Sequence, residues 1–156
     1  MIPSLVNLPG SPWPVLPPGI HSANLDEVGS VFATNPKRRK LYIGFVDASN
    51  QLRLAGCTMV YLDGSFVTGK PNPRDFDGCW EPSGINISQL NPVFLEFDNS
   101  RKSQKAEFGG EFFPVIKGKG QSFVDFFQKD RFSGMQKGII SILLQSDPLL
   151  VRGIQP

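Results

Sequence analysis

Two aspartates one residue apart give the sequence its clearest chemical pattern. Asp75 and Asp77 flank Phe76 at the start of an apolar segment. In a strand, residues i and i+2 share a face, so the two carboxylates are expected to project together while Phe76 points into the core. Adjacent carboxylates repel each other unless they share a divalent cation, and oxygen ligands suit Mg²⁺ or Mn²⁺. The pair predicts a metal site, although a D-x-D pair alone is also common on exposed strands.

A Gly-Ser pair follows the apolar run that precedes these aspartates. Gly64 and Ser65 come directly after the predicted strand at 57–62. A glycine lets the backbone come close to a ligand, and adjacent backbone N–H groups bind anions such as a phosphate. The other interpretation is a surface turn, because Gly-Ser is a common turn pair.

The spacing of the two pairs favours a joint site over a turn. Counted from Gly64, the order is G-S-x-x-x-G-x-x-x-x-x-D-x-D. On neighbouring strands, this order would bring a phosphate cradle together with metal-binding carboxylates. Such an arrangement suits an in-line displacement at a phosphate.

The segment LDGSFVTGKPNPRDFDGCW resembles the signature of the nucleotidyltransferase superfamily that includes DNA polymerase beta, the minimal nucleotidyltransferases and kanamycin nucleotidyltransferase. This resemblance implies a nucleotidyltransferase fold, phosphate binding by Gly64 and Ser65, and metal binding by Asp75 and Asp77. Further segments are similar to an uncharacterised bacterial family that carries the same signature: LPPGIH, TNPKRR, PVFLEF, QKAEFGGEFFP and FFQKD.

In that superfamily a later strand supplies a third carboxylate. The segment PVFLEFD offers Glu96 and Asp98. We prefer Glu96 because apolar residues flank it on both sides, whereas Asp98 begins a polar turn and is typical of a helix cap. The resemblance then assigns catalysis and metal binding to Asp75, Asp77 and Glu96.

Cationic residues near the motif are candidates for contacts with nucleotide phosphates. Lys70 and Arg74 lie between its two halves, and Lys102, with Arg101 and Lys105, follows the expected third strand. Each is also explained as part of a solvated loop or helix face.

Periodicity and end signals predict the elements that hold these residues. An Asn24/Glu27 capping box begins a helix over about 25–33, and Asn35-Pro36 begins a longer helix that Gly56 ends. Residues three or four apart give the longer helix its core face: Leu41, Phe45, Ala48, Leu52 and Ala55.

The remaining predicted elements are shorter. Strands are expected at 57–62, 75–80 and 93–98, a helical turn in RKSQKAEFGG, a loop at VIKGKGQS, a helix over 122–129, and either a strand or a helix end at 138–144. Together they predict an α+β (α/β-like) fold with a small mixed β-sheet flanked by helices.

Length and composition indicate one domain. The 156 residues predict a proline-rich extended arm over 1–20 and a single nucleotidyltransferase-like domain over 21–156. With 40% apolar residues and no long apolar run, we expect a soluble protein without a membrane span, and the proline-rich start does not fit a secretory signal. A cytoplasmic location is expected.

Charge and the rarer residue types add little further chemistry. The net charge of +2 does not itself indicate nucleic acid, and the basic run 37–40 is expected to be a solvated helix face rather than a phosphate patch. Cys57 and Cys79 are expected to be core thiols, and His21, the only histidine, to be structural. No serine has the partners of a hydrolase triad.

The sequence therefore predicts a Mg²⁺-dependent nucleotidyltransferase that moves a nucleoside monophosphate from an NTP, ATP included, to an acceptor hydroxyl on a protein, RNA or small molecule. A catalytically inactive binding or regulatory protein of the same fold is the alternative, with a protein partner in a toxin–antitoxin or phage-defence pair. A nucleic-acid-binding module resting on the basic run 37–40 is the third hypothesis.

Overall fold

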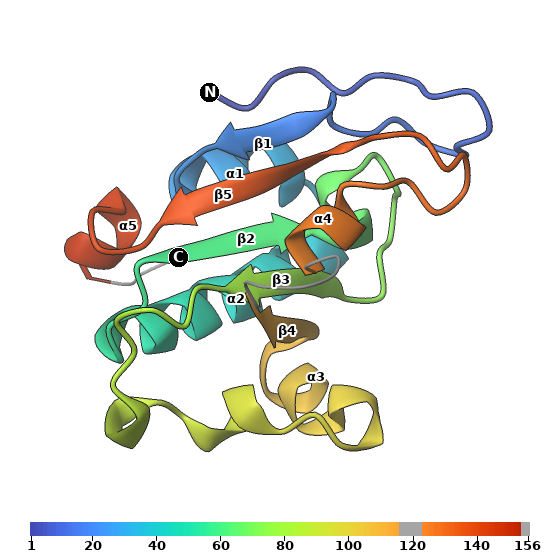
Figure 1. The fold of residues 1–156 in the computed structure, drawn as a ribbon. Coiled ribbons are helices and arrows are strands. Elements are labelled where there is room, and N and C mark those ends of the chain that lie inside the picture. Colours follow the sequence, from blue (N-terminus) through green and yellow to red (C-terminus); the bar gives the residue numbers. More distant parts are fainter. Residues whose placement is uncertain (116–122, 154–156) are drawn as a thin grey trace.

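A five-stranded mixed sheet lies at the centre of the computed structural model, which describes residues 1–115 and 123–153 (Figure 1). The strands are β1 (Gly19–Ser22), β2 (Met59–Asp63), β3 (Phe76–Trp80), β4 (Gly110–Pro114) and β5 (Gly138–Leu143). Their order is β1-β5-β2-β3-β4; β1 pairs in parallel with β5 and β3 with β4, while β2 is antiparallel to β5 and β3. The predicted α+β class is confirmed.

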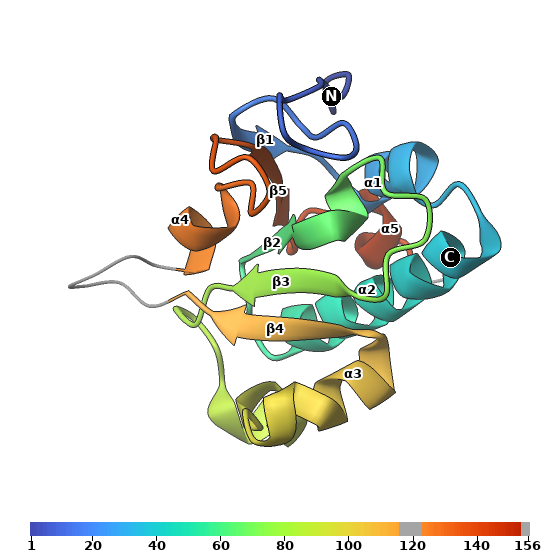
Figure 2. The ribbon, with the colours of Figure 1, turned by 90° about the vertical axis from the view of Figure 1, so that its right-hand side faces the viewer.

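Helices lie on both faces of this sheet. Within the described residues they are α1 (Leu25–Phe32), α2 (Pro36–Leu54), α3 (Lys102–Phe108), α4 (Phe123–Phe127) and α5 (Pro148–Val151). Figure 2 shows α1, α2 and α5 on one face and α4 on the other. None of these helices is long and apolar enough to cross a membrane.

Strand alternation divides the buried apolar residues between two cores. Phe76 and Trp80 of β3 belong to the main core, which also contains the apolar faces of α1, α2 and α5. Cys79 points to the opposite face, where it packs in a small second core with Phe113, Val124 and Ile139. The second face is therefore filled only in part by apolar side chains.

The two long helices begin and end as predicted. The Asn24 side chain accepts a hydrogen bond from the Glu27 amide at 2.8 Å, and Glu27 Oε1 accepts one from the Asn24 amide at 3.3 Å, which completes the capping box. Asn35 caps α2, with Pro36 in its first turn. The predicted core face of α2 is buried throughout: Leu41, Phe45, Ala48, Leu52 and Ala55.

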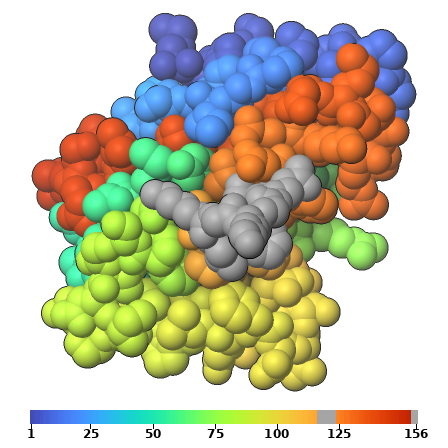
Figure 3. Space-filling model, in the orientation of Figure 1, coloured from blue at the N-terminus to red at the C-terminus, as the bar shows by residue number. Residues whose placement is uncertain are grey.

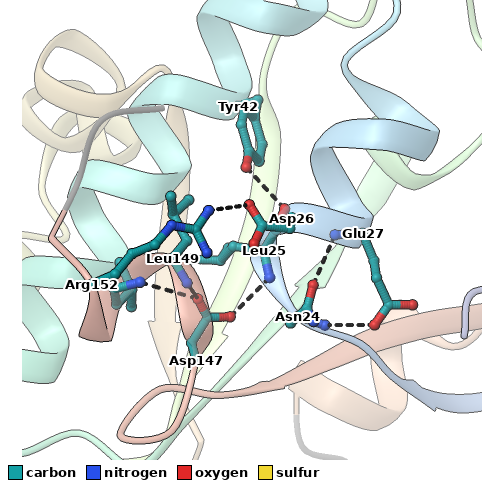
Figure 4. A network of polar contacts seen from close by, with 9 residues as sticks. Asn24, Leu25, Asp26, Glu27, Tyr42, Asp147, Leu149 and Arg152 are labelled. Carbon is teal, nitrogen blue, oxygen red and sulfur yellow. Dashed lines mark hydrogen bonds and ion pairs between the residues drawn. The ribbon is translucent and has the colours of Figure 1, made fainter.

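The buried Asp147 carboxylate ties α5 to α1 (Figure 4). It accepts hydrogen bonds from the Leu25 amide at 2.8 Å and from the Leu149 amide at 3.0 Å. On the other side of α1, the Tyr42 hydroxyl donates to the Leu25 carbonyl at 2.9 Å. These contacts fix the helices of the main core relative to one another, so that face of the sheet has a defined packing.

The strand predicted at 93–98 is wrong. Pro92–Leu95 forms a 3₁₀ turn in which the Asn91 side chain accepts from the Val93 amide at 3.1 Å. The Asn-Pro pair serves as a cap and a first-turn proline, as it does at the start of α2. Gln104 Nε2 donates to the Val93 carbonyl at 3.0 Å, so the segment packs on α3 instead of joining the sheet.

The two edge strands were not predicted. β1 lies across the expected boundary between arm and domain, directly after Pro17 and Pro18. β4 follows Gly109, whose φ of +89° ends α3, and it stops at Pro114. Short strands beside prolines are typical of sheet edges, where one side of the backbone needs no partner.

The other short elements agree with their predictions to within a few residues. The strands predicted at 57–62 and 75–80 are β2 and β3, the ambiguous segment 138–144 is the strand β5, and the helical turn at RKSQKAEFGG is α3. The helix predicted over 122–129 is α4, apart from residue 122, which lies outside the described residues. All but the first residue of the predicted loop VIKGKGQS lies outside them as well.

The amino-terminal arm folds back on itself and joins the domain. Val6 and Val15 form an antiparallel bridge, and Val15 forms a second bridge with Thr68. Leu16 is fully buried, as expected for a residue that packs on the domain. The extended arm predicted over 1–20 is thus in contact with the β2–β3 connection and contributes its last two residues, 19 and 20, to β1.

Candidate functional site

A cavity of about 810 Å³ opens on the sheet face opposite α1 and α2. Its wall contains six of the residues singled out in the sequence: Gly64, Ser65, Lys70, Arg74, Asp75 and Asp77. The wall is completed by the amino-terminal arm and by α4 with the segment that follows it. Figure 3 shows these two segments, in orange and blue, side by side on one surface of the molecule.

The Gly-Ser pair begins a tight turn at the end of β2. Gly64–Val67 is a 3₁₀ turn that starts directly after Asp63, and Gly64 has a φ of +76°. A Cβ atom at Gly64 would collide with the Asp77 carboxylate. Glycine is therefore required here both for the backbone conformation and for close contact between the turn and the aspartate.

The buried guanidinium of Arg38 fixes the rest of this connection. Arg38 is 4% exposed and donates to the carbonyls of Phe66 at 2.7 Å and Thr68 at 2.8 Å, and also to those of Phe32 and Lys70. Its burial corrects the prediction of a solvated run at 37–40, since only the other three residues of that run are exposed. A guanidinium has enough donors in one plane to satisfy several carbonyls at once.

Sheet pairing brings three carboxylates to the same level of one face. Asp77 is opposite Asp63 in the antiparallel pair β2–β3 and opposite Glu111 in the parallel pair β3–β4. Phe76, between the two cavity aspartates, is fully buried in the main core. Asp75 immediately precedes β3 and lines the cavity with Asp77, as the alternation predicted.

Burial and mutual repulsion raise the pKa values of these acids. The pKa of Asp77 is raised to about 7, first by burial and then by the charges of Asp75 and Glu111. The pKa of Asp75 is also raised, by burial and by Glu111. Such a cluster favours binding of a cation or retention of a proton.

Asp63 is the most deeply buried member of the cluster. It is fully buried, and burial followed by the charge of Asp77 raises its pKa well above the ordinary value. The Cys79 thiol donates to Oδ2 at 3.9 Å, while Oδ1 has no hydrogen-bond partner among the described residues. Both cysteines are buried and unpaired by a disulfide, as predicted for core thiols.

A buried lysine faces the same acids. Lys137 precedes β5, lines the cavity and is 8% exposed. Burial lowers its pKa, against the opposing charges of Asp63, Asp130 and Asp77. The cavity therefore contains both signs of charge, with further cationic side chains from Lys129 and Arg131.

The structure does not bring Glu96 or Lys102 to this cavity. Glu96 is exposed at the end of the 3₁₀ turn at 92–95, and Lys102 is exposed in the first turn of α3. The carboxylate beside Asp77 is Glu111, which accepts from Lys105 Nζ at 2.8 Å and from Arg101 at 3.5 Å. A single acid between Gly110 and two phenylalanines is the sequence feature that would have pointed to it.

The carboxylate oxygens at this end of the sheet are of the type that binds a hard divalent cation. Among residues 1–115 and 123–153, no three His, Cys, Asp or Glu side chains are grouped closely enough to hold a metal ion. Asp75 and Asp77 nevertheless supply adjacent carboxylates at the cavity wall, with Glu111 on the next strand and an unpartnered oxygen on Asp63. Carboxylate oxygens of this kind suit Mg²⁺ that keeps water or phosphate in its other positions.

Fold and cavity together define an α+β protein with a charged cavity at the end of a β-hairpin and its neighbouring strand. The sequence model of the family DUF6932, a family of unknown function, matches residues 11–143. The chain therefore belongs to that family. Neither the search of curated proteins nor the search of solved structures found a match. The matched range contains the Gly-Ser turn, both cavity aspartates and Glu111.

Proposed function

We propose that this protein is a Mg²⁺-dependent nucleotidyltransferase. It binds an NTP in the cavity, transfers the nucleoside monophosphate to an acceptor hydroxyl and releases pyrophosphate; Mn²⁺ is the alternative ion. The observation that carries the proposal is the direct packing of the Gly64 turn against Asp77, beside Asp75, in one cavity. The acceptor is a protein, an RNA or a small molecule.

Phosphate binding is assigned to the Gly64–Ser65 turn and the cations beside it. The turn faces the cavity, where Lys70, Arg74 and Lys137 offer positive charge. Charged donors of this kind form strong hydrogen bonds to phosphate oxygens. The clamp from Arg38 keeps the backbone of the turn in place, so the phosphate contacts need little reorganisation on binding.

Asp75 and Asp77 are the residues that would hold the metal, with Glu111 in place of the sequence-predicted Glu96. When bound, the cation would neutralise charge on the phosphates and on the leaving pyrophosphate. A bound cation would also offset the burial and the like-charge repulsion that raise the pKa values of both aspartates.

Transfer requires a group that takes the acceptor's proton. The acceptor oxygen forms a bond to the α-phosphorus, the bond between that phosphorus and the bridging oxygen to the β-phosphate breaks, and pyrophosphate leaves with the bonding electrons. We assign the hydroxyl proton to the Glu111 carboxylate, because it stands opposite Asp77 on the neighbouring strand.

Calorimetric titration of the four NTPs tests the proposal. Each is titrated into the wild-type protein and into the Asp75→Asn, Asp77→Asn double variant, with and without Mg²⁺ or Mn²⁺. We expect metal-dependent binding that the double variant loses while it remains folded by circular dichroism. Wild-type protein that binds none of the NTPs with either metal would overturn the proposal.

A second candidate is a nucleotide-binding module without catalysis, acting through a protein partner. The ion pair of Glu111 with Lys105, at 2.8 Å, favours it, because an acid held by a lysine is a poor third ligand for a metal. An α-labelled NTP incubated with the protein and with pools of RNA, protein and small molecules distinguishes the two. Label transferred to any pool supports the enzyme, whereas tight binding without transfer supports the module.

A further inference from the structure

Aromatic side chains form a second chemical feature of the cavity. Trp13, Phe126, Phe127 and Phe132 line it together with the charged residues described above. The rings of Trp13 and Phe132 meet edge to face, with centroids 5.5 Å apart. Phe126 is 58% exposed and Phe132 47% exposed, so these rings present apolar surface to the cavity instead of packing fully in a core.

Trp13 is held in this wall by the same connection that carries the Gly-Ser turn. The Gly69 amide donates to the Pro14 carbonyl at 2.8 Å, next to the bridge between Val15 and Thr68. Lys70 Nζ lies over the indole, 5.1 Å from its centroid. The indole is therefore fixed relative to the turn at Gly64, although 51 residues separate them in sequence (64 minus 13).

The combination of a flat ring and a cation at one end of a phosphate site matches the shape of a nucleotide. Nucleobases stack on aromatic side chains, and an ammonium group beside the ring can contact the phosphates. Trp13 and Lys70 provide such a pair. The base and the phosphates of an NTP belong to one molecule, so a base site must lie at a fixed position relative to the Gly-Ser turn. The acceptor is a separate molecule, and its site has no such constraint.

We propose that Trp13, supported by Phe132, is the platform on which the nucleobase of the bound NTP stacks. This inference rests on the proposed function, since it places the base of the same NTP whose phosphates bind at Gly64 and Ser65. The amino-terminal arm then contributes Trp13 to the binding site. Stacking accepts every base, so the platform supplies affinity for nucleotides as a class.

Comparison of NTPs with inorganic tripolyphosphate, which lacks a base, tests the platform. Both are titrated with Mg²⁺ into the wild type, Trp13→Leu, Trp13→Phe and, as a control elsewhere in the arm, Val6→Ala. We expect Trp13→Leu to weaken the best-bound NTP by at least about fivefold, which is the lower end for loss of one stacked base, and to leave tripolyphosphate unchanged. Trp13→Phe should restore most of the affinity, and Val6→Ala should behave as wild type.

The outcomes separate this inference from the function on which it rests. If tripolyphosphate binds the wild type but NTPs bind no more tightly, or if Trp13→Leu weakens both equally, the platform is overturned and the phosphate site stands. If neither ligand binds the wild type, the proposed function fails and the platform with it. Thermal unfolding of each variant checks that the arm remains docked.

Tryptophan fluorescence gives an independent readout. The protein has two tryptophans, and Trp80 is 2% exposed in the main core. A Trp80→Phe variant therefore reports on Trp13 alone. We expect an NTP to quench this emission and tripolyphosphate to leave it nearly unchanged; equal quenching by both ligands would contradict stacking on the indole.

Discussion

The two faces of the sheet differ in how their buried charged groups are satisfied. Under α1, α2 and α5, buried apolar side chains pack against one another, and the buried Asp147 carboxylate has hydrogen-bond partners, although the neutral Ser49 Oγ and Trp80 Nε1 have none among the described residues. On the opposite face, Asp63, Asp77 and Lys137 are buried or nearly so and carry raised or lowered pKa values. Buried charge is costly, so it is typical of sites where a ligand completes the interactions.

Three consecutive residues at the start of β3, Asp75 to Asp77, allow this contrast to be tested most sharply. Phe76→Ala should lower the free energy of unfolding by about 3–5 kcal/mol, since it empties part of the main core. Asp75→Asn and Asp77→Asn should instead reduce nucleotidyl transfer to the background rate and leave stability equal or higher, because each removes like-charge repulsion. Urea unfolding and transfer of α-labelled NTP measure the two effects. Aspartate variants that unfold as readily as Phe76→Ala would show that both faces are structural.

The position of the third carboxylate is the next comparison. Glu111→Gln should slow transfer about 10²–10⁴-fold, the range for loss of a general base, with NTP binding reduced less. Glu96→Gln is the matched control and should change neither, because Glu96 is exposed and, unlike Glu111, is not paired opposite Asp77 in the sheet. Steady-state rates of pyrophosphate release separate the two variants. A loss of transfer in Glu96→Gln with normal Glu111→Gln would restore the sequence-based assignment.

Arg38 links the end of α1 to the β2–β3 connection, and its replacement should affect the cavity more than the core. Arg38→Lys retains a charge but cannot satisfy all four carbonyls, so we expect NTP affinity to fall about tenfold, which corresponds to about 1.4 kcal/mol. Arg39→Gln, at the exposed neighbouring position, should leave affinity unchanged. Calorimetry measures both. Equal affinity in Arg38→Lys and wild type would mean that the turn keeps its shape without the clamp.

The last comparison is a pH dependence that belongs to one face. The unfolded chain releases the Asp77 proton near its ordinary pKa of 3.8, whereas the folded protein retains it to about pH 7. Between these values the folded state binds more protons, so the free energy of unfolding falls as the pH rises. Asp77→Asn lacks this contribution, and its Tm should therefore decrease less between about pH 4 and pH 7. The same slope in wild type and variant would assign the dependence to other groups.

Local patterns were sufficient to predict part of the candidate site. Gly64, Ser65, Asp75 and Asp77 are close in sequence, and the period of two in a strand determines which of them share a face. The helices α1 and α2 were predicted for the same reason, since their caps and apolar spacing are local. What depends on a few neighbouring residues could be predicted from the sequence.

The other residues of the candidate site depend on contacts between segments that are far apart in sequence. Glu111 reaches Asp77 only because β4 joins the edge of the sheet in parallel with β3, and neither glycines nor proline at its ends marked it as a strand. Arg38 appeared to be one of four solvated cations, because its acceptor carbonyls come from segments up to 32 residues away. Trp13 lines the cavity through contacts with Lys70 and Phe132, beside the hydrogen bond between Pro14 and Gly69, and no local pattern connects these residues.

A crystal structure with Mn²⁺ and a non-hydrolysable NTP analogue tests the central claim most directly. Anomalous scattering locates the manganese independently of the nucleotide. We predict a manganese peak between the carboxylates of Asp75 and Asp77, with the phosphates at Gly64 and Ser65. A nucleotide bound elsewhere, or manganese that contacts neither aspartate, would contradict the assignment of this cavity as a nucleotidyltransferase site.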